Sequence, residues 1–337
     1  ADRAFSSCPN LTKITIGANV ESVGAYAFSE CIALTDVVFK DSTIDKKTIG
    51  NYAFYNCRAL SNINFGNAVT SIGDYAFVMT ESLTSIEFPD SLVRIGNYAF
   101  SPYSNGYGGS YIEYTTSNLE NIKFGSGIKT IGKQAFYKNE KLKSIDLTGS
   151  NLTLIDTGAF QNCISLIEIN LSGNNLVIES SAFYDDKYLK NVTFGAGIKS
   201  IGSNAFYNCL SISELNFFDG LDRIYSDAFR NCKSISLVTL PNTLSSIGNS
   251  AFYNCERITS VHIPDKVTEI QGGCFTNCHL LKKVTIGSGC TSISPTAFTG
   301  ANSIEEIIVE EDNKKYTSVD GVLYNNDKTT LVLYPKG

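Results

Sequence analysis

Phenylalanine recurs along this chain of 337 residues at an almost constant spacing, and alanine precedes it at all but one of thirteen positions. The recurring residues are Phe5, Phe28, Phe54, Phe77, Phe100, Phe136, Phe160, Phe183, Phe206, Phe229, Phe252, Phe275 and Phe298. Their intervals are 23, 26, 23, 23, 36 and 24 residues, followed by six of 23. Such a period is typical of a solenoid, in which each repeat stacks on its neighbours because it cannot bury its apolar side chains alone.

Each repeat has the same internal pattern, counted from its phenylalanine. Aliphatic or aromatic residues stand at +6, +9, +11, usually +15, and +18, as Ile86 and Phe88 do at +9 and +11. The spacing of two predicts a short strand with one buried face, and such strands would pair side by side. The run Ala-Phe-x-x-Cys suits a single helical or 3₁₀ turn, and glycine at +19 in seven repeats marks a bend.

Two motifs connect this pattern with a known family. Leu83-Thr-Ser-Ile-Glu-Phe88 is followed by Ile95-Gly-Asn-Tyr-Ala-Phe100, and Ile247-Gly-Asn-Ser-Ala-Phe-Tyr-Asn-Cys255 repeats the second motif. The chain resembles the BspA-like (Treponema-type) leucine-rich repeat family over nearly its whole length. The resemblance implies a leucine-rich-repeat solenoid of about thirteen repeats of about 23 residues. A parallel β-sheet would line its concave face and short helical or 3₁₀ turns its convex face.

The repeat also predicts the domain organisation. We expect the solenoid over 1–309, with an insertion loop at 101–118, and a C-terminal β-hairpin cap over 310–337. The cap is predicted because two β-rich runs flank an Asn/Asp turn after the last repeat, and the family has a similar tail. Ala1 begins midway through a repeat, so we expect a fragment or a chain whose N-terminal section was removed.

Composition excludes several classes of function. The net charge is 27 − 33 = −6, so no basic surface is available for nucleic acid. The longest apolar run covers five residues, Tyr75–Met79, so we predict no membrane insertion. Two histidines leave little material for acid–base chemistry, and no Gly-rich phosphate loop or nucleophile elbow is present. We therefore predict no catalytic residues and no cofactor.

The ten cysteines follow the repeat. Eight stand at +3, Cys274 replaces the alanine before Phe275, and Cys290 takes the +15 position of its repeat. We expect buried thiols, because parallel side chains at strand spacing are too far apart for a good disulfide. Cys274 and Cys278 with His279 lack a fourth ligand, so we predict no metal site.

The insertion after Phe100 is the first candidate binding region. It carries Tyr103, Tyr107, Tyr111 and Tyr114 among glycine and serine, a composition that resembles antibody binding loops. The alternative is a tolerated surface loop whose tyrosines fold back over the edge of the solenoid.

The outward face of the strands is the second candidate. Positions +8 and +10 vary between repeats, whereas the inward columns do not, and a solenoid sheet commonly forms a long binding surface. An ordinary solvated strand face would look similar. The candidates on this face are Glu87, Lys123, Glu168, Glu214 and His262.

These observations, with the family resemblance, favour a non-enzymatic extracellular protein-recognition module that is secreted or attached to a bacterial cell surface. The resemblance implies adhesin-type binding of a protein partner, such as a host matrix protein or a cell-surface glycoprotein. The alternative is a structural spacer or stalk within a larger surface protein.

Overall fold

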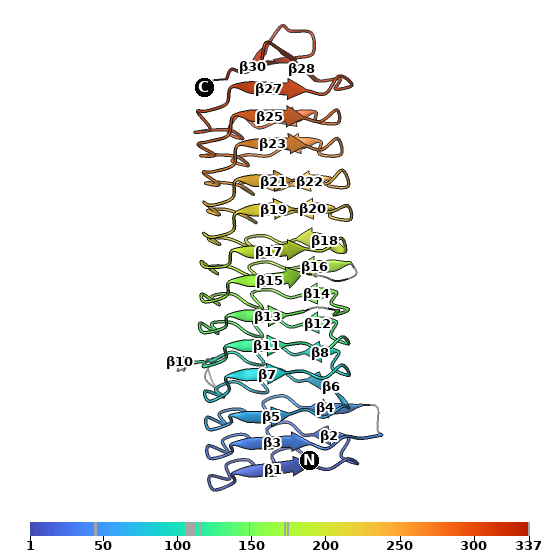
Figure 1. The fold of residues 1–337 in the computed structure, drawn as a ribbon, viewed down its shortest axis with the longest axis vertical. Coiled ribbons are helices and arrows are strands. Elements are labelled where there is room, and N and C mark those ends of the chain that lie inside the picture. Colours follow the sequence, from blue (N-terminus) through green and yellow to red (C-terminus); the bar gives the residue numbers. More distant parts are fainter. Residues whose placement is uncertain are drawn as a thin grey trace. The chain divides into compact units, whose positions relative to one another are not determined.

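The computed structural model describes residues 1–43, 46–105, 112–114, 116–147, 149–171, 173 and 175–335, with the backbone alone at 103–105 and 112–114. The chain divides into two compact units, 1–174 and 175–337. Within the described residues every regular element is a strand (Figure 1). No helix in this part is long and apolar enough to cross a membrane.

The first unit is a parallel β-solenoid with two strands in nearly every repeat (Figure 1). One column of strands contains β1 (Lys13–Ile16), β3 (Asp36–Phe39), β5 (Asn62–Asn64), β7 (Ser85–Glu87), β11 (Asn121–Lys123), β13 (Ser144–Asp146) and β15 (Glu168–Leu171). The other contains β2 (Ser22–Val23), β4 (Lys47–Ile49), β6 (Val69–Ile72), β8 (Arg94–Ile95), β12 (Thr130–Ile131) and β14 (Leu154–Ile155). The antiparallel pair β9 (Tyr103–Asn105) and β10 (Ile112–Tyr114) lies within the insertion.

The second unit repeats this arrangement. Its first column contains β17 (Asn191–Phe194), β19 (Glu214–Asn216), β21 (Leu237–Thr239), β23 (Ser260–Ile263), β25 (Lys283–Ile286) and β27 (Glu306–Val309). Its second contains β16 (Leu176–Ile178), β18 (Ile198–Ile201), β20 (Arg223–Ile224), β22 (Ser246–Ile247), β24 (Glu269–Ile270) and β26 (Ser292–Ile293). Three antiparallel strands follow, which are β28 (Tyr316–Val319), β29 (Val322–Asn325) and β30 (Leu331–Leu333).

The buried columns confirm the period-two strand prediction. Ile86 and Phe88 are 3% and 2% exposed, whereas Glu87 between them faces solvent. The recurring phenylalanines stack face to face inside each unit, with ring centroids 5.0 Å apart for Phe54 and Phe77 and 5.2 Å apart for Phe206 and Phe229. This spacing is close to the separation of neighbouring strands, so each repeat adds one phenylalanine ring to a continuous stack in the core of its unit.

The turn after each Ala-Phe differs from the predicted helical or 3₁₀ turn, which is not found in the described residues. In most repeats the residues two before and two after the phenylalanine have positive φ, as at Tyr26 (57°) and Glu30 (63°) around Phe28. The N–H groups of these three residues donate to carbonyls of the following repeat, at 2.8–2.9 Å. A helix would direct successive N–H groups back along its own axis, so this alternation excludes one.

The second column of strands was not predicted from the sequence. In this column the +18 residue is buried, as Ile95 and Ile247 are. Glycine follows at +19 because the turns approach closely there: a Cβ on Gly96 would lie 2.5 Å from the carbonyl carbon of Gly73. The predicted bend at +19 therefore has a steric cause.

Lys47 is a buried cation inside the first unit. It pairs with Val69 in the +15 column and is 1% exposed. Its Nζ donates to the carbonyls of Gly17, Ala18 and Val20 at 3.0, 2.6 and 2.8 Å. Three acceptors satisfy all three ammonium protons, so this charged side chain is accommodated in the core.

The C-terminal sheet is tied to the last repeats by Asn313. Its Nδ2 donates to the carbonyls of Gly287 and Cys290, while its Oδ1 accepts from the N–H groups of Lys315 and Tyr316. The pairing of β29 with β30 is the hairpin expected around the Asn/Asp turn, and β28 adds a third strand that was not predicted. The assignment of 310–337 as a cap stays a prediction.

Candidate binding surface

Two candidates from the sequence lie side by side on the strand face of the first unit. Lys123 of β11 is in register with Glu87 of β7 and, on its other side, with Asp146 of β13. The ammonium of Lys123 is 2.5 Å from Glu87 Oε1, and this hydrogen bond raises the pKa of the lysine. Both side chains are largely exposed, so the pair contributes little to stability and remains accessible to a partner.

The other strand-face candidates occupy separate places. Glu168 is exposed on β15 of the first unit, next to Ser144 in the ladder. In the second unit, Glu214 pairs in register with Leu237, and His262 with Thr285. All three side chains are exposed, and the residues they pair with in these ladders are not other candidates.

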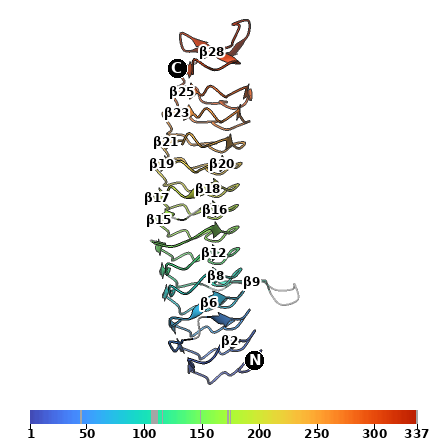
Figure 2. The ribbon, with the colours of Figure 1, turned by 90° about the vertical axis from the view of Figure 1, so that its right-hand side faces the viewer.

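The tyrosine-rich insertion is described only in part. The backbones of Tyr103 and Tyr114 are paired in register between the antiparallel strands β9 and β10, and Figure 2 shows β9 running outward from the stacked turns. Tyr107 and Tyr111 lie outside the described residues, as do the side chains of all four tyrosines. Whether these tyrosines contact a partner stays a prediction.

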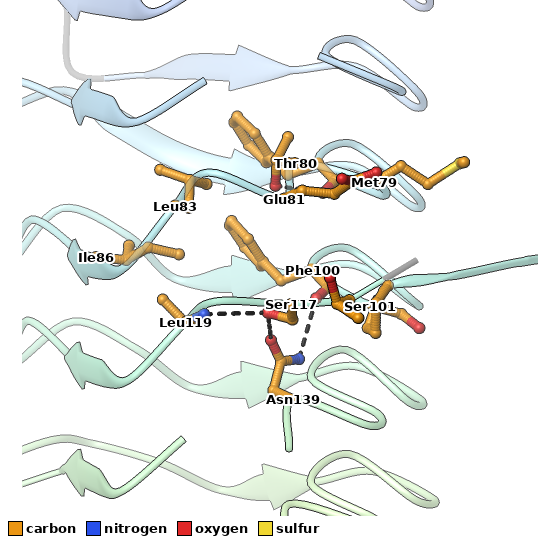
Figure 3. Close-up of a pocket in the computed structure, with 13 residues that line it drawn as sticks. Met79, Thr80, Glu81, Leu83, Ile86, Phe100, Ser101, Ser117, Leu119 and Asn139 are labelled. Carbon is orange, nitrogen blue, oxygen red and sulfur yellow. Dashed lines mark hydrogen bonds between the residues drawn. The ribbon is translucent and has the colours of Figure 1, made fainter. Parts of the chain in front are cut away.

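The base of the insertion is fixed by Asn139, which takes the +3 place that cysteine occupies in many repeats (Figure 3). Its side chain is fully buried. Nδ2 donates to the carbonyl of Phe100 at 3.1 Å, and Oδ1 accepts from the hydroxyl of Ser117 at 2.6 Å. Ser117 Oγ also accepts from the N–H of Leu119. One side chain therefore joins both ends of the insertion to the next repeat.

The cysteines at +3 are hydrogen-bonded thiols. Seven of them donate Sγ–H to the phenylalanine carbonyl of the preceding repeat at 3.1–3.4 Å. Burial raises the pKa of Cys255 well above its ordinary value and that of Cys278 to about 12. None of the ten cysteines forms a disulfide in the part of the chain that the structure describes, and these residues contain no group of three or more metal-ligating side chains.

Sequence reasoning missed a ladder of asparagines at +2 in the second unit. Nδ2 of each asparagine donates to the side-chain oxygen at the same position of the preceding repeat at 2.8–2.9 Å, and the first acceptor is an aspartate. The recurrence of asparagine at +2 was the available signal in the sequence, because asparagine tolerates the positive φ that this position requires. The ladder runs through Asp185, Asn208, Asn231, Asn254 and Asn277.

A comparable stack of tyrosines at −2 occurs in the first unit. The rings lie 4.7–4.9 Å apart, and the guanidinium of Arg3 lies 4.8 Å from the first ring. The backbone there is also at positive φ, which costs about 1–3 kcal/mol at each residue unless its surroundings compensate. The members are Tyr26, Tyr52, Tyr75 and Tyr98.

Several solved bacterial structures are similar to this chain. A leucine-rich repeat protein from Bacteroides ovatus is 23% identical, with 88% of this chain and 86% of that one covered and a TM-score of 0.49. A leucine-rich cell surface protein from Faecalibacterium prausnitzii is 21% identical, with 92% and 82% covered and a TM-score of 0.43. The pneumococcal vaccine antigen PcpA is 19% identical, with 94% and 81% covered and a TM-score of 0.46.

No curated protein matches the chain. A family model does: the BspA type leucine-rich repeat region, in six copies, matches residues 1–105, 109–236 and 199–329. These matches cover most of the sequence and include the stacked strands of both units. The chain belongs to the BspA-type leucine-rich repeat family.

Proposed function

We propose that this chain is a non-enzymatic protein-recognition module. The observation that carries the proposal is the contrast between the two faces of the first column of strands. Inward positions such as Ile86 and Ile122 are buried and nearly invariant in type, whereas outward neighbours such as Glu87 and Lys123 are exposed and vary between repeats. A repeated scaffold with a variable outer face suits the binding of an extended protein surface.

The finer proposal is a secreted or cell-surface adhesin whose partner is a matrix protein or a cell-surface glycoprotein. Membership of the BspA-type family supports it, because proteins of this family generally bind other proteins. Short polar side chains of mixed charge on the strand face also suit a protein partner better than an apolar ligand.

A binding array tests this function. The intact chain is applied to immobilised matrix proteins and cell-surface glycoproteins, beside a variant in which Glu87, Lys123 and Glu168 are all alanine. A matched control carries alanine at Glu256, Lys266 and Glu269, exposed or half-exposed residues outside the first column of strands. We expect capture by the wild type and the control and weaker capture by the strand-face variant. Failure of the wild type to capture any protein would refute the function.

A spacer within a larger surface protein is the second candidate. The asparagine ladder and the stacked rings couple each turn to the next, and such coupling would stiffen a stalk. Replacement of residues 103–115 by a short glycine–serine linker, combined with alanine at Glu87, Lys123 and Glu168, separates the two functions because it removes both candidate binding regions. A spacer would keep all attachment, whereas a recognition module would lose part of it.

A further inference from the structure

The first column of strands opens between β5 and β7. In the described residues β1, β3 and β5 form one sheet, β7 begins the next, and no backbone pairing joins them. Ile63 of β5, an inward residue, is consequently half-buried, whereas the equivalent Val37 and Ile86 are 0% and 3% exposed. The opening therefore reaches the edge of the core.

A proline accounts for one missing rung of this ladder. Where strands are paired, the N–H at +12 donates to the carbonyl at +11 of the preceding repeat, as Lys40 does to Ile16 at 3.0 Å. Pro89 occupies +12 after β7 and has no N–H to offer the carbonyl of Phe65. Pro241 has the same place, yet β19 and β21 stay paired over three residues, so the proline removes a rung without opening a sheet by itself.

A groove of 530 Å³ lies at this opening, within the range of sites that hold a ligand group. It is lined by three turns of the first unit, and its floor lies over Phe65, Phe88 and Phe124, which are 2%, 2% and 4% exposed. On the far side β7 is closed against the next repeat, since a Cβ on Gly125 would clash with the carbonyl oxygen of Pro89. Access is therefore from the strand face.

The polar side chains of the groove are mainly hydrogen-bond acceptors. Glu87 and Asp90 supply carboxylates, and Asn64 supplies an amide oxygen. The N–H of Ser126 donates to Asp90 and lowers the pKa of that carboxyl, so it is ionised at neutral pH. The charged donor here is Lys123, whose side chain is exposed. In the described residues its one ion pair is with Glu87.

We propose that this groove receives an arginine side chain of the protein partner. The inference rests on the proposed recognition function and assigns it a partner chemistry. A guanidinium offers five donors in one plane and can bind a carboxylate through two of them, so it matches a groove whose polar side chains are mainly acceptors. Glu87 would exchange its contact with Lys123 for one with the incoming arginine.

The test uses a nine-residue peptide of glycine and serine with one central arginine, and a twin in which citrulline replaces arginine. Citrulline keeps the shape and loses the charge. Saturation-transfer NMR with the intact chain measures binding of each peptide. We expect the arginine peptide to bind at least about fivefold more tightly than its twin, the effect of one accessible charge pair.

Three variants locate the site. E87Q should weaken binding of the arginine peptide about fivefold, and K123A should strengthen it because the competing cation is gone. P89A restores an N–H toward Phe65 and should weaken binding with no change of charge. The control is P264A, which alters the same +12 place in the second unit, where β21 and β23 are also unpaired; it should leave binding unchanged.

Equal binding of the two peptides, or an unchanged affinity in E87Q, would overturn the inference. The array described above keeps this result distinct from the proposed function. If the wild type captures a protein and E87Q and P89A capture it equally well, recognition stands and the arginine site fails. If the wild type captures nothing, the recognition function itself fails.

Discussion

Replacement of Asn139 tests how the insertion is anchored. Alanine would remove two hydrogen bonds and leave the carbonyl of Phe100 and the hydroxyl of Ser117 without this buried partner. Each orphaned group costs about 1–3 kcal/mol, and the adjoining cavity of 10 Å³ is at the lower limit for one water. We expect Asn139→Ala to lower the free energy of unfolding by about 2–4 kcal/mol.

Asn139→Cys is the matched variant, because cysteine is the usual residue at this place. Its thiol could donate to Phe100 as Cys163 donates to Phe136 in the next repeat, at 3.3 Å. It would still lose the short contact with Ser117, so we expect a cost of about 1 kcal/mol. Urea unfolding measures both variants, and hydrogen exchange at residues 116–119 reports on the base of the insertion.

The comparison has a clear contrary outcome. If alanine and cysteine cost the same, the Phe100 carbonyl does not need this donor. If hydrogen exchange at 116–119 is unchanged in both variants, Asn139 does not hold the insertion. Ser117→Ala is an independent test. It should lower the free energy of unfolding by less in the Asn139→Ala background than in the wild type, since the two residues share one hydrogen bond.

Three further predictions follow from buried and charged groups. Lys47→Met should lower the unfolding free energy by about 3 kcal/mol in urea titrations, because three backbone carbonyls lose their donor. A thiol reagent should modify Cys8 alone in the native protein, since it is the one half-exposed thiol, and the rest only after denaturation. N–H donors from Ser126 and Ser288 lower the pKa values of Asp90 and Asp265, so their stabilising contribution is complete above about pH 4 and is lost as pH falls through the lowered values. Acid titration of the urea midpoint should therefore show a smaller decline in the double asparagine variant.

The columns of the core were predictable because they repeat. A side chain that recurs every 23 residues must meet its own copy in the next turn, so burial of Phe229 or Cys232 follows from the period alone. The strand at +8 to +10 was also predictable, since two inward residues are enough to show a spacing of two. These features depend on the sequence within one repeat and on its copy.

The second column and the turn could not be derived in the same way. A strand such as Arg94–Ile95 has one buried residue, which carries no period. The apolar pattern of Ala-Phe-x-x-Cys fits a helical turn as well as the observed turn, in which N–H groups of alternate residues bond to the next repeat. The two kinds of turn differ in the φ angles at −2 and +2, where recurrent asparagine and glycine, such as Asn231 and Gly158, indicate positive φ.

The pairing of Glu87 with Lys123 shows how far the candidate site could be predicted from the sequence. The two are 36 residues apart, and they become neighbours only because the insertion leaves the stack and the period resumes after it. The groove could not be predicted from the sequence, because it depends on the absence of backbone pairing between β5 and β7. Pro89 was the available signal, because proline at the end of a strand removes one donor.

We expect the proposed recognition function to be concentrated at the departures from the repeat. In the second unit +3 is cysteine in four repeats and the asparagine ladder runs without a gap from 185 to 277, so the turn side there is committed to stacking. In the first unit Lys47 replaces an aliphatic residue, Pro89 removes a rung, and Asn139 replaces cysteine at the insertion. Lys47 and Asn139 each form hydrogen bonds with polar groups of the preceding repeat, as expected when irregular segments are retained in a regular core.

A substitution in a regular column changes the packing against the repeats on both sides. A substitution in a segment that has its own hydrogen bonds does not change that packing. We therefore expect the specificity of binding to follow substitutions around the insertion and the β5–β7 groove.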